Sequence, residues 1–101
     1  MKPPLPKTLR KYGLTEQDWI MMYNDQGGCC AICGNSLEDR RANIDHFHRQ
    51  GWKKLSDEKR KQDIRGILCW TCNRLIVGRG VNLKRLYKAV EYLEAFEKRK
   101  R

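Results

Sequence analysis

Residues 29–34 read CCAICG and residues 65–73 read RGILCWTCN, and these two stretches decide the fold. Each stretch contains two cysteines separated by two residues, Cys30 and Cys33 in the first and Cys69 and Cys72 in the second. A two-residue spacer lets both sulfurs of a pair reach one ion from a tight turn, and two such pairs complete the tetrahedron that a structural zinc prefers. We therefore predict a four-cysteine zinc site that joins the two stretches and leaves no coordination position open for a substrate.

A fifth cysteine, Cys29, precedes the first pair. It is an alternative ligand to Cys30, but only the spacer that begins at Cys30 matches the second pair, so we expect Cys29 to be a packed thiol outside the site. An odd number of cysteines argues against a closed disulfide framework. Paired cysteines that stay reduced are typical of metal sites inside the cell, and this pattern predicts a cytoplasmic protein.

The chain has 101 residues and a formal net charge of +10. This length indicates one domain over residues 1–101, with a basic N-terminal arm at 1–11 and a basic C-terminal tail at 98–101. A zinc ion with four thiolates contributes about −2, so roughly +8 remains. A surplus of this size favours a polyanionic partner such as a nucleic acid. No apolar run approaches the length of a membrane span, so a membrane is not an expected partner.

The N-terminal part of the chain predicts one arm and one helix. Residues 1–11 contain three prolines and are expected to form an extended arm. The helix should begin after Thr15, a residue type that caps helix N-termini, and should end at Gly27 and Gly28. Its apolar face is expected to comprise Leu14, Trp19, Met22 and Tyr23.

Two short strands are expected on either side of a polar insertion. Residues 43–48 (NIDHFH) alternate well enough for a strand, and residues 65–68 (RGIL) form the returning strand. Residues 49–63 between them are rich in lysine and arginine and are expected to be a long polar insertion. Residues 69–76 (CWTCNRLI) are expected to form a short helix that opens at the second cysteine pair.

Asn82 is the expected N-cap of a last helix. The apolar residues of this helix recur at spacings of three and four, namely Leu83, Leu86, Val90, Leu93 and Phe96. Such a stripe is typical of a core-facing side or of a face for a partner helix. The sequence therefore leaves open whether the protein is a monomer or a homodimer.

The segment between the cysteine pairs contains Asp45, His46 and His48, and Asn73 directly follows the last cysteine. Regular alternation would put Asp45 and His46 on opposite faces of a strand, but a bulge could bring both to one site. A neutral histidine is a suitable general base near neutral pH. The oxygens of Asp45 and Asn73 are ligands that Mg²⁺ prefers, and such a cation stabilises charge on a phosphate. The combination predicts hydrolysis of phosphodiester bonds.

The motifs C-A-I-C-G, I-D-H-F-H and R-G-I-L-C-W-T-C-N, preceded by Y-G-L-T-E-Q-D-W, resemble the phage recombination endonuclease VII family of HNH nucleases over residues 12–78. The resemblance implies an α+β fold, a small ββα-metal (HNH) core stapled by the four-cysteine zinc and flanked by N- and C-terminal helices. It implies that Asp45 and Asn73 bind Mg²⁺ or another divalent metal. It also implies that His46 activates water as the general base and that His48 contacts the phosphate. A phage-encoded protein that acts in the cytoplasm of a bacterial host is expected.

Basic side chains of the insertion and of the second strand are the candidate DNA contacts, namely Lys53, Lys54, Lys61 and Arg65. Trp52 is a candidate for stacking on bases. Trp70, between the second pair of cysteines, could also stack on bases but is expected rather in the core beside the zinc.

The leading functional prediction is a metal-dependent DNA endonuclease that nicks or cleaves phosphodiester bonds. One alternative is a zinc-containing module that binds nucleic acid without cutting it. Another is a resolvase of branched DNA such as a Holliday junction, which needs two active sites and therefore a dimer. The combination of Asp45, His46 and Asn73 favours the endonuclease over the binding module, whereas the basic charge fits all of these functions.

Overall fold

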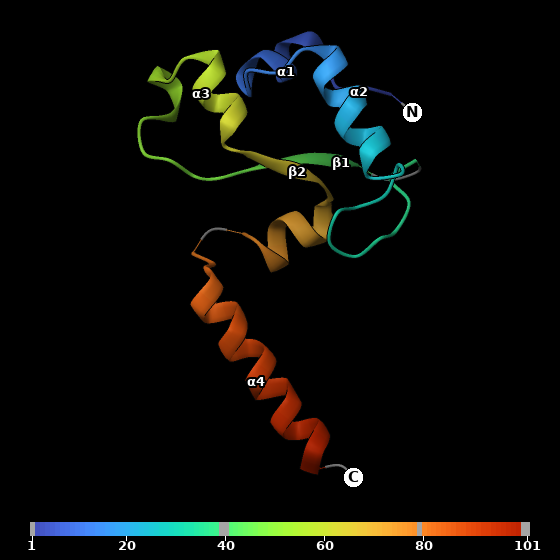
Figure 1. The fold of residues 1–101 in the computed structure, drawn as a ribbon, viewed down its shortest axis with the longest axis vertical. Coiled ribbons are helices and arrows are strands. Elements are labelled where there is room, and N and C mark those ends of the chain that lie inside the picture. Colours follow the sequence, from blue (N-terminus) through green and yellow to red (C-terminus); the bar gives the residue numbers. More distant parts are fainter. Residues whose placement is uncertain (1, 39–40, 79, 100–101) are drawn as a thin grey trace.

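The computed structural model describes residues 2–38, 41–78 and 80–99. The elements follow one another as α1 (Pro6–Lys11), α2 (Glu16–Asp25), β1 (Ala42–His46), a 3₁₀ turn η1 (Trp52–Lys54), α3 (Asp57–Gln62), β2 (Ile64–Cys69), a π-helical turn η2 (Cys72–Ile76) and α4 (Leu83–Arg99). β1 and β2 form an antiparallel hairpin with helices before and after it (Figure 1). The predicted α+β class is therefore confirmed. Met1 of the predicted arm and residues 100–101 of the predicted tail lie outside the described residues.

Residues 6–11 form helix α1, so the prediction of an extended arm is wrong for them. Pro6 occupies the first turn of α1, where an N–H group would have no acceptor within the helix and where the fixed φ of proline suits helical backbone. Leu9 on this helix is buried in the core. Burial of this apolar side chain stabilises the packing of the short helix against the core.

Helix α2 begins where its capping residue predicts. The Thr15 hydroxyl accepts a hydrogen bond from the Asp18 N–H at 3.1 Å, and the Asp18 carboxylate accepts one from the Thr15 N–H at 2.9 Å. This capping box satisfies two N–H groups that the helix itself leaves without partners. Gly27 and Gly28 have φ values of 66° and 69° and end the helix, as predicted.

The core lies between α1, α2 and the hairpin (Figure 1). Its buried apolar residues are Leu9, Leu14, Trp19, Tyr23, Leu37, Ile44, Ile67 and Leu68, together with Cys30, Cys69 and Cys72. Trp19 and Ile67 are the largest fully buried side chains among the described residues. The predicted apolar face of α2 is therefore confirmed, with Met22 partly buried at its edge.

The hairpin has one irregularity, which lies between Asp45 and His46. Asp45 pairs with Gly66 and His46 pairs with Ile64, so Arg65 has no partner on β1. Such an extra residue is a β-bulge, and it bends the strand and increases its twist. β1 ends at His46, two residues earlier than predicted, because the chain then turns into the insertion.

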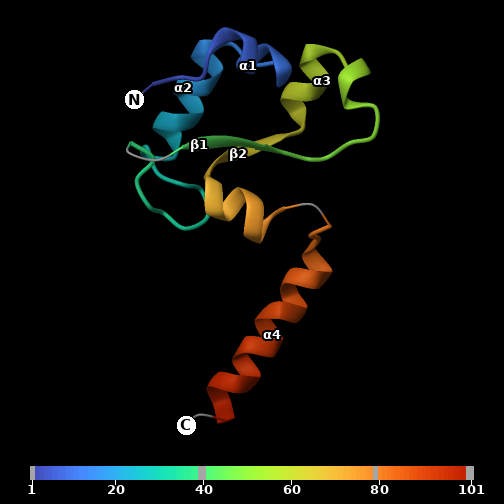
Figure 2. The ribbon, with the colours of Figure 1, turned by 180° about the vertical axis from the view of Figure 1, so that it is seen from behind.

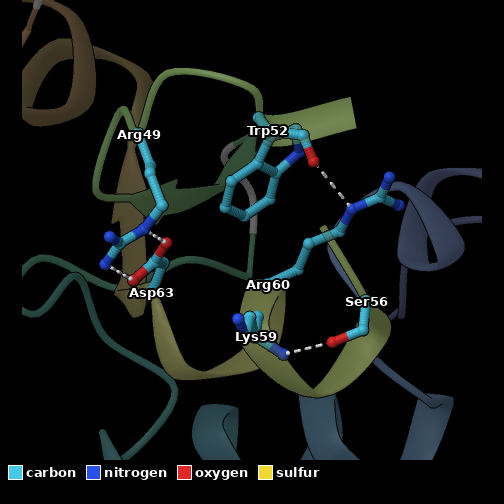
Figure 3. Close-up of polar contacts among 6 residues, drawn as sticks. All are labelled: Arg49, Trp52, Ser56, Lys59, Arg60 and Asp63. Atoms are coloured by element: carbon cyan, nitrogen blue, oxygen red, sulfur yellow. Dashed lines mark hydrogen bonds and ion pairs between the residues drawn. The ribbon is translucent and has the colours of Figure 1, made fainter. Parts of the chain in front are cut away.

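The insertion between the strands is folded. It contains η1 and α3, and the Phe47 N–H donates a hydrogen bond to the Asp63 carbonyl oxygen at 2.8 Å, across the two ends of the insertion. Ser56 caps α3, since its hydroxyl accepts a hydrogen bond from the Lys59 N–H at 3.3 Å (Figure 3). The insertion therefore has regular structure that its polar composition did not indicate.

Helix α4 extends away from the body, as both views show (Figures 1 and 2). Asn82 caps it as predicted, with its side-chain oxygen accepting a hydrogen bond from the Arg85 N–H at 2.9 Å. No residue of Leu83–Arg99 is buried, and Leu83, Val90 and Leu93 are among the exposed ones. The apolar stripe therefore does not form part of this chain's core. In the ranges that the structure describes, no helix combines the length and apolarity needed to cross a membrane.

Candidate active site and metal centre

Four cysteine side chains converge from the two predicted pairs. The Sγ atoms of Cys30, Cys33, Cys69 and Cys72 all lie within 4.8 Å of one another, and those of Cys33 and Cys69 are 3.9 Å apart. Zinc–sulfur bonds of about 2.3 Å put the sulfurs of a tetrahedral site about 3.8 Å apart, so this donor set fits zinc. Cys29 is outside the cluster, with its sulfur 3.4 Å from the Gly27 carbonyl oxygen, which confirms the assignment of Cys30.

Gln26 braces the first cysteine pair against β2. Its side-chain amide donates hydrogen bonds to the carbonyl oxygens of Cys29 at 2.8 Å and Ile67 at 2.9 Å, and its Oε1 accepts one from the Ile67 N–H at 2.9 Å. Ala31 adds a backbone hydrogen bond to the Ile67 carbonyl oxygen. Protein hydrogen bonds therefore help to hold the first pair of cysteines next to β2.

Two of the four thiols, those of Cys30 and Cys72, differ in how readily they ionise. Burial opposes ionisation of Cys30, but backbone N–H donors, with that of Cys69 the foremost, outweigh it and lower the pKa of Cys30 to about 6. Burial, the largest cause, and hydrogen bonds with the neighbouring thiols together raise the pKa of Cys72 to about 12. Zinc binds thiolates, so metal binding must release the proton of Cys72.

A second centre lies in a cavity of about 870 Å³ that is lined by the end of β1 and by η2. The four residues predicted for catalysis all line it, namely Asp45, His46, His48 and Asn73. Three of them come from the strand end and its continuation, and Asn73 comes from η2, directly after the last cysteine of the cluster. The structure thus brings together residues that the cysteine cluster holds on two separate elements.

Asp45 is buried, with 5% of its surface exposed, and it forms an ion pair with Arg65. Both carboxylate oxygens accept hydrogen bonds from the guanidinium, Oδ2 from Nε at 2.7 Å and Oδ1 from Nη2 at 3.0 Å. A carboxylate offers about four lone-pair sites, so each oxygen retains capacity for a second partner. Together with the side-chain oxygen of Asn73, Asp45 is a donor set that fits a hard divalent cation such as Mg²⁺.

Aromatic rings surround the imidazole of His46. The centroid of the imidazole lies 4.5 Å from the ring centroid of Trp52, 4.7 Å from that of His48 and 5.3 Å from that of Tyr12. Burial lowers the pKa of His46, and the charge of His48 lowers it further, while the charge of Asp45 opposes them. The imidazole is therefore held in its neutral form, in which it can accept a proton.

The recombination endonuclease VII family matches residues 6–95, which is most of the chain. The chain belongs to this family. The match extends beyond the predicted resemblance at both ends, so that it includes α1 and most of α4.

Two phage proteins are similar to this endonuclease VII family member. The Gene 59 protein of Mycobacterium phage D29 is 33% identical over 89 residues, and the Gene 59 protein of Mycobacterium phage L5 is 32% identical over 89 residues. Each alignment covers 86% of this chain but only 47% and 48% of the respective relative, so the chain spans about half the length of these proteins. No solved structure matches the chain significantly.

The basic residues predicted to contact DNA differ in exposure and in ion pairing in this family member. Lys53 and Lys54 are exposed on η1. Lys61 forms an ion pair with Asp18, with Nζ and Oδ1 2.9 Å apart, and Arg65 is bound to Asp45. Two of the four predicted contacts therefore already have protein partners.

The prediction that Trp70 lies in the core beside the cysteines is wrong. Its side chain is 48% exposed, lines the cavity, and stacks with the guanidinium of Arg74 at 5.4 Å. Cys72 is the buried residue of η2 and occupies the side that faces the core.

Two residues at these two centres were missed from the sequence, namely Gln26 and Tyr12, and Trp52 was singled out only for stacking on bases. Gln26 and Tyr12 act across long separations, such as the 41 residues between Gln26 and Ile67. No local spacing links Tyr12 or Trp52 to His46, although an aromatic residue within a polar insertion is a signal that a packing role exists.

Proposed function

We propose that this chain is a metal-dependent DNA endonuclease of the HNH kind, which nicks or cleaves phosphodiester bonds. The observation that carries the proposal is the single cavity lined by Asp45, His46, His48 and Asn73. Membership of the endonuclease VII family supports a nuclease acting on DNA. We treat residues 1–101 as one endonuclease domain, and the phage origin of the two relatives supports an enzyme acting in an infected bacterial cell.

The roles of the residues follow from their chemistry. The neutral imidazole of His46 accepts the proton of the attacking water, and burial keeps it neutral. Asp45 and Asn73 would hold Mg²⁺ or a similar cation, which when bound stabilises the charge on the phosphate and on the leaving oxygen. His48, beside His46 on the cavity wall, would contact the phosphate.

The cysteine cluster has a structural role in this proposal. Cys30, Cys33, Cys69 and Cys72 would together saturate a zinc ion, leaving no position for a substrate, and would thereby hold η2 against the hairpin. Asn73 is the residue after Cys72, and its position in the cavity therefore depends on the cluster. Lys53, Lys54, Lys61 and Arg65 are the proposed DNA contacts, of which Lys61 and Arg65 would have to leave or share their present partners.

A plasmid-nicking assay with and without Mg²⁺ tests the function. His46→Ala should lower the nicking rate by about 10²–10⁴-fold, the usual contribution of a general base. Asp45→Ala and Asn73→Ala should show a similar defect that higher Mg²⁺ concentrations partly rescue, whereas added Mg²⁺ should not rescue His46→Ala. Circular dichroism and zinc content control for folding.

Two results would contradict the proposal. If His46→Ala nicks DNA as fast as the wild type, the general base is assigned incorrectly. If the wild type cuts no form of DNA with any divalent metal while binding DNA well, the chain is a nucleic-acid-binding zinc module.

A further inference from the structure

The insertion between β1 and β2 is closed at its base and braced inside. Arg49 and Asp63, at its two ends, form a bidentate ion pair, with Nε to Oδ2 at 2.8 Å and Nη2 to Oδ1 at 3.0 Å (Figure 3). Inside the insertion, Arg60 on α3 donates hydrogen bonds to the carbonyl oxygens of Trp52 at 3.2 Å and Lys53 at 2.6 Å. These contacts fix the backbone of Trp52 on η1 relative to α3.

The insertion also packs against the N-terminal helices. The indole Nε1 of Trp52 donates a hydrogen bond to the carbonyl oxygen of Lys11, at the end of α1, at 3.3 Å. Gly13 has a φ of 69°, and a Cβ at this position would overlap the carbonyl oxygen of Asp57 at the start of α3. The turn between α1 and α2 therefore contacts α3 directly, and Trp52 is held at its ring as well as at its backbone.

The ring held in this way lies against the proposed general base. The rings of Trp52 and His46 have a centroid separation of 4.5 Å and an interplanar angle of 39°. Tyr12 contacts both rings, at 5.3 Å from His46 and 6.3 Å from Trp52. Tyr12 and His46 line the cavity, whereas Trp52 is not among the described residues that line it.

We propose that Trp52 is a positioning residue that, together with Tyr12, holds the imidazole of His46 toward the cavity. His46 is the last residue of β1, so no further residue of this strand follows to restrict the position of the His46 side chain. Aromatic packing supplies that restriction, since paired rings favour particular relative orientations. The insertion thus positions a catalytic group, in contrast to the sequence-based expectation that Trp52 stacks on DNA bases. This inference rests on the proposed role of His46.

The first measurement is independent of nuclease activity. The chain contains two histidines, so a protein labelled with ¹³C-histidine gives two sets of ring signals, and His46→Ala assigns them. The Trp52 ring current should displace the His46 signals from those of a free imidazole. Trp52→Ala should remove much of this displacement, and Trp52→Phe should retain part of it.

The second measurement separates positioning from DNA contact. A misplacement of about 1 Å in a reacting group can cost about 10²-fold in rate, so Trp52→Ala should lower kcat for nicking by roughly 10–10²-fold while KM for DNA stays unchanged. Trp52→Phe should recover most of kcat. Phe47→Ala is the matched control, because it removes the neighbouring aromatic ring, which packs on Arg49 at 5.4 Å. Thermal unfolding and zinc content control for folding.

The outcomes are distinct. An unchanged His46 signal in Trp52→Ala would overturn the inference, and so would a rise in KM at constant kcat, since that would place Trp52 on DNA. An unchanged kcat in a folded Trp52→Ala protein whose His46 signal has moved would also overturn it. A wild type that cuts no DNA would instead refute the proposed function, while the ring signals would still report whether the Trp52 ring lies against His46.

Discussion

Replacement of Arg65 by alanine tests Asp45 as a metal ligand without any measurement of cleavage. The Arg65 guanidinium is the cation beside the buried Asp45 carboxylate and donates to both of its oxygens. Removal of one partner of a fully buried pair costs about 3–5 kcal/mol. The Arg65 side chain is 46% exposed, so water screens the pair and partly replaces the lost hydrogen bonds. We therefore expect Arg65→Ala to lower the free energy of unfolding by about 1–3 kcal/mol.

The chain contains a matched control in its other bidentate Arg–Asp pair. Arg49 binds Asp63 at 2.8 Å and 3.0 Å, and the side chains of this pair are 52% and 9% exposed, compared with 46% and 7% for Arg65 and Asp45. Arg49→Ala should therefore also destabilise the protein in a buffer without added divalent metal. The two variants differ in one respect, because Asp63 is not among the described residues that line the cavity with Asn73.

Added Mg²⁺ should separate the two variants. In Arg65→Ala the Asp45 oxygens no longer bind the guanidinium. Mg²⁺ therefore does not have to share these oxygens or to approach a positive charge. A ligand that binds only the folded state stabilises it by about 2.7 kcal/mol at 100 times its Kd. Mg²⁺ should thus restore most of the stability lost in Arg65→Ala, and should stabilise Arg49→Ala no more than the wild type.

Urea unfolding followed by tryptophan fluorescence, at increasing Mg²⁺ concentrations, measures these differences. Zinc content is monitored throughout, since loss of zinc would unfold all of the proteins alike. If Mg²⁺ stabilises Arg65→Ala and Arg49→Ala equally, Asp45 does not bind the cation in the way proposed. An Asp45→Asn and Arg65→Ala double variant that still responds to Mg²⁺ would locate the ion elsewhere.

Three further predictions concern the zinc, the basic surface and the general base. Cys33→Ser or Cys72→Ser should unfold much of the protein, because metal-binding energy at such sites is folding energy; circular dichroism of a well-folded, zinc-free protein would contradict this. Affinity for duplex DNA should fall with salt with a log–log slope of about −0.9 per phosphate contact, and joint replacement of Lys53 and Lys54 by alanine should flatten the slope in a filter-binding titration, whereas an unchanged slope would remove η1 from the docking surface. Burial lowers the pKa of His46, so the acid limb of kcat/KM for nicking should lie below the usual histidine pKa of about 6.5, and a limb above that value would speak against His46. The same shift means that His46 contributes its stability above its unfolded-state pKa of about 6.5, and that this contribution is lost as pH falls toward the lower folded-state pKa.

The predictable features of this fold are those that local chemistry determines. The cysteine spacing specified the cluster, and Thr15, Gly27 and Asn82 specified helix ends through hydrogen bonds within a few residues. The convergence of Asp45, His46 and Asn73 could also be predicted, because the two cysteine pairs bring the flanking segments of the chain together.

Features that depend on distant partners escaped prediction. The polar composition of residues 49–63 gives no apolar period, and the insertion is ordered by the Arg49–Asp63 pair and by contacts with α1. The stripe on α4 was correctly recognised as amphipathic, but periodicity cannot tell whether a helix packs on its own chain. Arg65 has the composition of a phosphate contact, and only the folded hairpin reveals that it faces Asp45.

The β-bulge at Arg65 has a consequence for how such a protein can change by mutation. Arg65 is the residue without a partner on β1, and it is also the cation beside Asp45. Loss of its single codon would remove both the extra residue and the ion pair, while all four cysteines would keep their spacing within each pair. On the proposed roles, one in-frame deletion would therefore release Asp45 from its arginine and remove one proposed DNA contact, without touching the four cysteines.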